Sequence, residues 1–337
     1  MKFELYDIRC AKATEYERIR DFINNDWKKN HILAVSKKLF DFQHLRPKES
    51  EYDFVIAEHK TTKQIHAVYG YINSAIYDQG SCDNPNAVWG ALWKVKKGIE
   101  NKEVRKLGLG VLLYIIDRFP KTPFITLGLS KDSQTVFEGL NFVFGKMNHY
   151  YIASDSFSKY NIIESPKFKD VSTNSEYSFS TFDFKQNIES DYLPLKNNSY
   201  LARRYSNHPF YKYLLLGLYK GDVLINVWVI REIDINNAKC LRLVDIVGRT
   251  KGLPDVSYAI KKLLNHHGAE YIDCYNYGVS EQEFNTMGFL TVESPTIVPN
   301  YFEPYEKRNV DIYFAYTFDK DICIFKGDGD QDRPSLI

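Results

Sequence analysis

The most constraining feature of this chain is a pair of glycines between a strand-like run and a helix-like run. Residues 87–97 read as a strand and residues 111–117 as an apolar helix, with Arg105-x-x-Gly108-x-Gly110 between them. Glycine lets a backbone come close to a ligand. The first amides of a helix lack partners and lie at its positive end. The pattern therefore predicts either a phosphate-binding turn or a tight strand-to-helix connection.

The spacing excludes two common phosphate loops. The chain has no G-x-x-x-x-G-K-[ST] run, and the dinucleotide fingerprint needs a third glycine near position 113, which is Leu. The order strand, [RQ]-x-x-G-x-[GA], helix, strand, helix resembles the acyl-CoA site of the GNAT superfamily of N-acyltransferases. The resemblance implies that loop amides hold the coenzyme A pyrophosphate and that the preceding strand pairs with the pantetheine arm. It assigns coenzyme binding to Trp93, Lys94, Val95, Arg105, Lys106, Gly108, Leu109, Gly110 and Val111.

Residues 1–155 are predicted to form one mixed α/β unit that contains this motif. Apolar periodicity and turn residues predict strands at 3–9, 53–59, 64–77, 87–97, 124–129 and 141–152, and helices at 15–30, 31–45, 108–118 and 132–139. This order of elements matches a GNAT domain. A polar connector is predicted at 156–198, with a possible strand near 177–184.

Residues 199–320 are predicted to repeat the first unit, and 321–337 to form a tail. Strands are predicted at 213–219, 223–232, 238–247, 269–275 and from 289, with helices at 254–267 and 280–286. The predicted fold class is therefore α+β, with two tandem GNAT-like domains that each have a mostly antiparallel sheet flanked by helices. The second copy lacks the glycine motif, and Pro254 removes a donor at its helix start. We expect it not to hold coenzyme A and its free cleft to receive the acceptor.

A tandem with one coenzyme motif is similar to bacterial N-acyltransferases that act on nucleotide-linked amino sugars. Segments 39–45, 200–210 and 326–334 resemble the GNAT-type dTDP-3-amino-3,6-dideoxyhexose N-acyltransferases. The resemblance implies acyl transfer from acyl-CoA to the amine of such a sugar, in the synthesis of lipopolysaccharide or O-antigen precursors. One alternative is a tandem peptidyl or aminoacyl transferase of the cell-wall type, which usually has a coiled helical insert and a basic surface. Another is a non-catalytic binding protein that keeps the fold.

Acyl transfer requires a polarised thioester carbonyl, a neutral amine and a proton for the leaving thiolate. In the family a backbone N–H polarises the carbonyl, here expected near Trp93–Val95. The family commonly supplies the proton from a Tyr where this chain has Phe137. Water or another hydroxyl, such as Tyr150 or Tyr151, would then have to serve, or the site is degenerate.

Two residues are candidates for catalysis. His44, preceded by Gln43, ends a predicted helix where the family's first helices line the acceptor cleft, so His44 is a candidate base and Gln43 a candidate substrate contact. The alternative for His44 is a helix cap. Asp245 lies in an apolar strand, where a carboxylate is costly unless it is paired, so it is either structural or functional.

Two charged segments near the second half invite binding hypotheses. Arg203, Arg204, Tyr205 and His208 combine guanidinium groups, a stacking ring and polar donors that suit a nucleotide diphosphate; the alternative is a solvated basic turn. Asp328-x-Asp330-x-Asp332 resembles the start of a calcium loop, but position 333 is Arg rather than Gly. We therefore predict a flexible or docking tail and no metal site.

Composition limits the partners. The 337 residues carry 44 basic and 43 acidic side chains, so the net charge of +1 gives no long-range attraction to nucleic acid or to an anionic membrane. Five scattered cysteines without C-x-x-C spacing suit a reducing compartment. The sequence shows no apolar signal core and no run of about 18 apolar residues. We expect a cytoplasmic enzyme with small-molecule substrates; the oligomeric state is left open.

Overall fold

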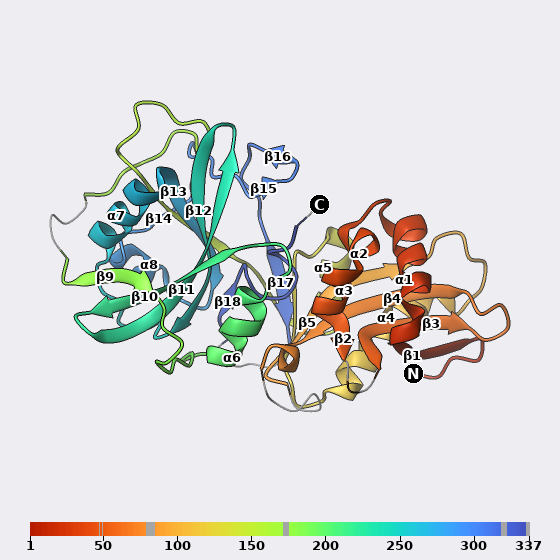
Figure 1. Ribbon diagram of the computed structural model, residues 1–337. Coiled ribbons are helices and arrows are strands. Elements are labelled where there is room, and N and C mark those ends of the chain that lie inside the picture. Colours follow the sequence, from red (N-terminus) through yellow and green to blue (C-terminus); the bar gives the residue numbers. More distant parts are fainter. Residues whose placement is uncertain (47, 49, 79–84, 171–174, 318–321, 335–337) are drawn as a thin grey trace.

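The computed structural model describes residues 1–46, 48, 50–78, 85–170, 175–317 and 322–334. It has two lobes, each built on one twisted sheet (Figure 1). The elements of the first stretch are β1 (Tyr6–Lys12), α1 (Tyr16–Phe22), α2 (Ile32–Val35), α3 (Lys37–His44), β2 (Leu45–Arg46), β3 (Glu51–His59), β4 (Ile65–Asn73), β5 (Val88–Val95), α4 (Val104–Arg118), β6 (Phe124–Leu127), α5 (Lys131–Gly139) and β7 (Val143–Lys146). Short helical turns η1 (Ala13–Glu15), η2 (Ile23–Trp27) and η3 (Ser74–Ile76) connect some of them.

The remaining elements belong mainly to the second lobe. They are β8 (Asn148–Ala153), β9 (Tyr177–Thr181), α6 (Asn198–Tyr200), η4 (Leu201–Ser206), β10 (Tyr213–Lys220), β11 (Val223–Ile235), β12 (Ala238–Gly248), α7 (Ser257–His267), β13 (Ala269–Tyr277), α8 (Glu281–Thr286), β14 (Leu290–Thr291), β15 (Tyr301–Phe302), β16 (Tyr305–Glu306), β17 (Tyr313–Tyr316) and β18 (Ile324–Phe325).

The first sheet has the strand order β1-β3-β4-β5-β6-β17-β7, and only its β5–β6 pair is parallel. Helices cover both faces. Leu107, Val111 and Ile115 of α4 pack on one face, and α1–α3 pack on the other through Ile19 and Phe40. Apolar residues at helical spacing on one side of α4 explain why it docks there.

The second sheet has the order β14-β8-β13-β12-β11-β10-β9, with β12–β13 as its parallel pair. Helix α7 packs Ile260 and Leu264 against it. In both lobes a parallel pair of strands is connected through one long helix, α4 or α7, and a short helix, α5 or α8, follows. These two mostly antiparallel sheets flanked by helices confirm the predicted fold class.

The two sheets exchange strands. The strand predicted at 141–152 to close the first unit is wrong in its second part, because β7 stays in the first sheet whereas β8 pairs with β13 in the second. In return, β17 inserts between β6 and β7 of the first sheet, as Figure 1 shows between the lobes. A strand that precedes the predicted boundary at residue 155 thus belongs to the second sheet, and a strand that precedes the boundary at residue 320 belongs to the first.

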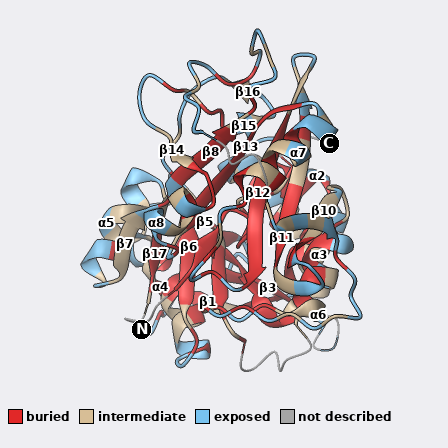
Figure 2. Cartoon of the chain, turned by 90° about the vertical axis from the view of Figure 1, so that its left-hand side faces the viewer, coloured by how far each residue is buried: buried red, intermediate tan, exposed pale blue. Residues whose placement is uncertain are grey.

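A continuous apolar core joins the lobes. It contains Trp89 and Leu127 of the first sheet together with Val227 and Val244 of the second, all buried. The strands at the centre of the molecule are accordingly buried in Figure 2. No helix among the described residues is both long and apolar enough to cross a membrane.

Candidate functional site

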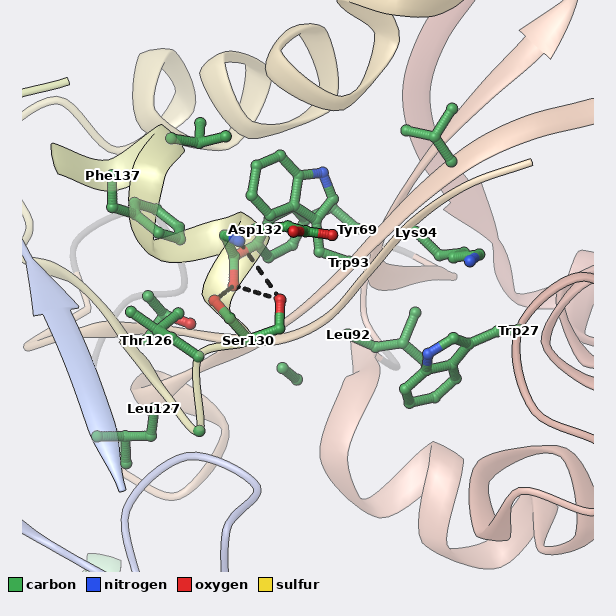
Figure 3. Close-up of a pocket in the computed structure, with 16 residues that line it drawn as sticks. Trp27, Tyr69, Leu92, Trp93, Lys94, Thr126, Leu127, Ser130, Asp132 and Phe137 are labelled. Carbon is green, nitrogen blue, oxygen red and sulfur yellow. Dashed lines mark hydrogen bonds between the residues drawn. The ribbon is translucent and has the colours of Figure 1, made fainter. Parts of the chain in front are cut away.

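The first sheet opens where its parallel pair ends. β5 and β6 pair from Val88 and Phe124 to Gly90 and Thr126, after which β5 continues without β6. A cavity of about 510 Å³ lies in this opening (Figure 3). Its lining comprises Trp27, Tyr69, residues 91–95, residues 126–130, Asp132, Ser133, Val136 and Phe137. We call this cavity the β5–β6 cleft.

A β-bulge marks the closed end of the cleft. On β4, Gly70 pairs with Leu92 and Tyr71 with Gly90, so Ala91 has no opposite residue there. A bulge redirects the backbone of the extra residue, and bulges are frequent beside active sites. A redirected N–H at this point is suited to polarise a carbonyl. The bulge was not predicted, although Gly90 signals it in the sequence, because a glycine inside a strand often marks a bulge or a close approach.

The predicted strand contacts are in the cleft. Trp93, Lys94 and Val95 all line it. The Trp93 indole N–H also donates to the Gly108 carbonyl oxygen at 3.2 Å, which ties α4 to β5. The bulge at Ala91 lies two residues before Trp93, where the polarising amide was expected; the role of a backbone amide here stays a prediction.

The glycines of the motif have a packing role. Helix α4 begins at Val104 rather than 108, so Gly108 and Gly110 lie inside it and are buried. A Cβ on Gly110 would lie 2.7 Å from the Phe3 ring, and one on Gly108 would lie 3.3 Å from Val95. Small residues at these positions let the helix approach the sheet.

The start of α4 is partly occupied by the chain itself. The Asn101 side-chain oxygen accepts hydrogen bonds of 3.0 Å from the N–H groups of Glu103 and Val104. Arg105 and Lys106 in the first turn are exposed, whereas Leu109 is half-buried and Val111 is buried. Phosphate binding by α4 stays a prediction, and its two exposed cations are the groups available for it.

His44 and Gln43 lie in the core of the first lobe. His44 is fully buried, its Nδ1 lies 2.8 Å from the Tyr71 carbonyl oxygen, and its ring contacts those of Phe40 and Phe54. Burial lowers the pKa of His44 to about 4. Gln43 is equally buried. Neither residue lines the β5–β6 cleft. The contact of His44 with Tyr71 ties α3 to β4, and the proposed roles of both residues toward a substrate stay predictions.

Asp245 belongs to a buried ion network. It accepts hydrogen bonds from Lys196 Nζ at 2.8 and 2.9 Å and from the Tyr205 hydroxyl at 2.7 Å. Lys196 Nζ also lies 2.8 Å from Asp328. All four side chains are buried, so Asp245 is paired, which is the structural alternative left open by the sequence.

In the basic segment 203–208, Arg204, Tyr205 and His208 are buried, whereas Arg203 is exposed. Arg204 is 1% exposed and donates to the carbonyl oxygens of Gly327 and Gly329. The Arg203 guanidinium is exposed and donates to the Asp78 carbonyl oxygen at 3.4 Å. His208 is buried, and its Nδ1 accepts from the Tyr211 N–H at 2.9 Å.

The C-terminal segment, residues 322–334, enters the opening between β12 and β13 of the second lobe. β12 and β13 pair in parallel as far as Leu243 and Cys274. Beyond that point β18 pairs with Asn276 and Tyr277 of β13, and the Gly327 N–H donates to the Val244 carbonyl oxygen at 2.7 Å. A cavity of about 1030 Å³ nevertheless lies beside β18, and its lining includes Tyr192, Thr250, residues 277–281 and Cys323. The expectation that the second lobe receives the acceptor stays a prediction.

Of the two alternatives predicted for the tail, flexible or docking, residues 322–334 agree with the docking one. Asp328, Asp330 and Asp332 are at most 3% exposed. Asp332 accepts a hydrogen bond of 2.7 Å from the Tyr213 hydroxyl, and Asp330 pairs with Arg333. Each carboxylate thus has a specific partner inside the fold.

The proposed substitutes for a proton donor lie elsewhere. Tyr150 and Tyr151 are on β8 in the second sheet, where Tyr150 stacks on Phe284 with ring centroids 4.0 Å apart. Phe137 itself lines the cleft and contacts the Trp93 ring.

No protein-family model and no curated protein matches this sequence. The fold is similar to a GCN5-related N-acetyltransferase from Anabaena variabilis ATCC 29413, with a TM-score of 0.56, 8% identity, and 92% of this chain and 72% of that chain covered. Weaker matches are a GCN5-related N-acetyltransferase from Sphaerobacter thermophilus (TM-score 0.41, 10% identity, 94% and 96% covered) and Saccharomyces cerevisiae N-myristoyltransferase (0.45, 8%, 94% and 80%). At these identities the Anabaena match shows the GNAT fold and nothing further.

Proposed function

We propose that this protein is an N-acyltransferase that binds its acyl-CoA donor in the β5–β6 cleft. The observation that carries the proposal is the opening of the parallel pair at Gly90 and Thr126 with a bulge at Ala91. It leaves one edge of a strand beside a cavity of about 510 Å³. The GNAT fold of the chain supports the same placement.

Each part of the cleft has a matching part of acyl-CoA. The edge of β5 over residues 92–95 can pair with the two amide groups of the pantetheine arm, as an added strand pairs with a sheet edge. The Ala91 N–H polarises the thioester carbonyl. Arg105 and Lys106 supply positive charge for the pyrophosphate.

We propose an amine of a nucleotide-linked amino sugar as the acceptor to test first. Its support is the resemblance of segments 39–45, 200–210 and 326–334 to N-acyltransferases of that class. Arg204 and Tyr205 are buried in the fold, so nucleotide recognition would have to use other groups. A thiol-release assay over a panel of amino-sugar nucleotides checks this proposal; release that no amine accelerates would contradict it.

The donor proposal predicts that acetyl-CoA raises the melting temperature and that NAD and ATP at equal concentration do not. Ser133→Trp fills the cleft from α5 and should abolish the shift. Glu138→Trp is the matched control, because Glu138 is exposed on the same helix outside the cleft lining. Absence of a shift at millimolar acetyl-CoA would contradict the proposal, as would an unchanged shift in Ser133→Trp.

If Arg105 and Lys106 bind the pyrophosphate, their loss should weaken the binding of one acyl donor and not of another. Replacing both Arg105 and Lys106 by Ala should weaken acetyl-CoA binding by about tenfold, because two charge-assisted contacts are lost. It should leave S-acetylpantetheine, which lacks the diphosphate, unaffected. Lys121→Ala, an exposed lysine after the other end of α4, is the control. Calorimetric titration measures both affinities, and equal losses for the two donors would place the phosphates elsewhere.

A further inference from the structure

The leaving group in the proposed reaction needs a proton, and the cleft does not offer it from α5. Phe137 occupies the position of the family's tyrosine, is fully buried, and packs its ring against Trp93 and Phe142. An aromatic hydrocarbon donates no proton. Another group must therefore replace that donor, and its assignment rests on the proposed function.

The Tyr69 side chain lines the cleft from β4, the strand that pairs with β5. It lies on β4 opposite Trp93, lines the cavity, and has its ring between those of Trp93 and Phe124, with centroids 5.3 and 5.9 Å away. Its hydroxyl reaches the closed end of the cleft: a Cβ placed on Gly90 would lie only 2.7 Å from it. Gly90 is the last residue of β5 that pairs with β6 and precedes the bulged Ala91.

Its surroundings keep the phenol protonated. Tyr69 is only 2% exposed, and burial raises its pKa; the nearby Asp330 adds to the rise, and Thr126 partly offsets it. A group in this state can give a proton but cannot act as a base at neutral pH. Its proton is therefore present at neutral pH when the C–S bond breaks and negative charge develops on the sulfur.

The other hydroxyls of the cleft are less suitable. Ser130 and Ser133 hydrogen-bond each other at 2.9 Å and cap the start of α5. Thr126, like both serines, carries an aliphatic hydroxyl, which is a much weaker acid than a phenol. Among the described lining residues, Tyr69 is the one phenol.

We propose that Tyr69 donates the proton to the coenzyme thiolate as it leaves. The neutral acceptor amine attacks the thioester carbon, the C–N bond forms and the C–S bond breaks. The C–S electron pair stays on sulfur, which takes the phenolic proton to give free coenzyme A. The attacking nitrogen releases one proton to water, and the phenolate regains one from water, so charge and protons balance.

The test compares Tyr69→Phe with Tyr71→Phe. Tyr71 is a second fully buried tyrosine on β4; its hydroxyl lies 3.7 Å from Cys10 Sγ and it does not line the cleft. Thiol release from acetyl-CoA is measured with UDP-glucosamine as the probe amine and with water alone, and the acetyl-CoA dissociation constant by calorimetry. We expect Tyr69→Phe to slow release by about 100-fold with the dissociation constant changed less than about twofold, and Tyr71→Phe to match the wild type.

A solvent deuterium isotope effect separates proton donation from packing. The wild type should release thiol more slowly in deuterium oxide, and Tyr69→Phe should lose that dependence. Gly90→Ala, whose methyl group displaces the Tyr69 hydroxyl, should reproduce the slow rate. An unchanged rate of thiol release in Tyr69→Phe overturns the assignment. A slower rate that is explained by weaker acetyl-CoA binding also overturns it, as does a wild type that binds acetyl-CoA but releases no thiol. No acetyl-CoA binding by the wild type refutes the proposed function itself and the assignment with it.

Discussion

At the scale of single residues, Asp245 shows how the same carboxylate can suit catalysis in the sequence and a structural role in the fold. It lies in an apolar strand, where an unpaired carboxylate would suggest function. In the fold it accepts hydrogen bonds from Lys196 and Tyr205. Removing one member of a buried ion pair leaves the other charge without compensation.

Asp245→Asn should therefore lower the free energy of unfolding by roughly 3 kcal/mol while the folded fraction keeps its acetyl-CoA affinity. Asp311→Asn removes a surface ion pair with Lys146, whose side chains are 54% and 51% exposed, and should cost at most about 0.5 kcal/mol. Urea unfolding and calorimetry measure both quantities. Equal stability of the two variants would show that the network contributes nothing.

Residue types and spacing predicted part of the site. Trp93, Lys94 and Val95 were placed by the order of strand, glycine motif and helix, and they do line the cleft. A helix end beside the family's acceptor cleft predicts His44 and Gln43, and the fit of a guanidinium to phosphate predicts Arg204, but all three are buried through contacts with distant parts of the chain that the local sequence does not reveal. The sequence does not indicate Tyr69, because nothing local distinguishes it from Tyr71, the other tyrosine of β4.

At the scale of elements, the C-terminal segment explains why the lobes differ. In the second lobe β18 pairs with the end of β13, and a cavity lies beside it, whereas in the first lobe the cavity lies directly between the parting strands β5 and β6. Local periodicity predicted most strands. It could not predict the pairing of β18, or the insertion of β17 beside β6, because such pairing joins residues far apart in the sequence.

Docking of this segment can be tested at Gly278. This residue has a φ of 104°, and a Cβ there would lie 2.4 Å from the Ile322 carbonyl oxygen. Gly268 also has a positive φ, of 60°, but has open space around it. Gly268→Ala should cost about 1 kcal/mol of stability from backbone strain, and Gly278→Ala about 1–3 kcal/mol more from the clash. Thermal unfolding of both variants checks this, and equal losses would argue against close packing of residues 322–334.

At the scale of the whole molecule, buried neutral histidines should make stability depend on pH. Burial lowers the pKa of His44 to about 4 and those of His31 and His208 to about 3, whereas unfolded histidine titrates near 6.5. The unfolded chain therefore binds more protons between these values. The stabilisation is complete above about pH 6.5 and is lost as the pH falls toward 4.

At pH 5.5 the expected loss is about 1 kcal/mol for each of the three histidines relative to pH 7. Asp328 opposes it, because burial raises its pKa to about 6 and protonation then favours the fold. Urea unfolding across this range measures the slope, and His44→Phe should remove about a third of the histidine contribution. A stability that stays constant or rises from pH 6.5 to 4.5 would contradict this account.

The location of the donor site is most directly tested by hydrogen–deuterium exchange with and without coenzyme A. The account predicts slower exchange in peptides covering residues 91–95 and 128–137, and no change at residues 271–275 of β13 in the second lobe. Protection confined to the second lobe, or no protection at a saturating concentration of coenzyme A, would contradict it.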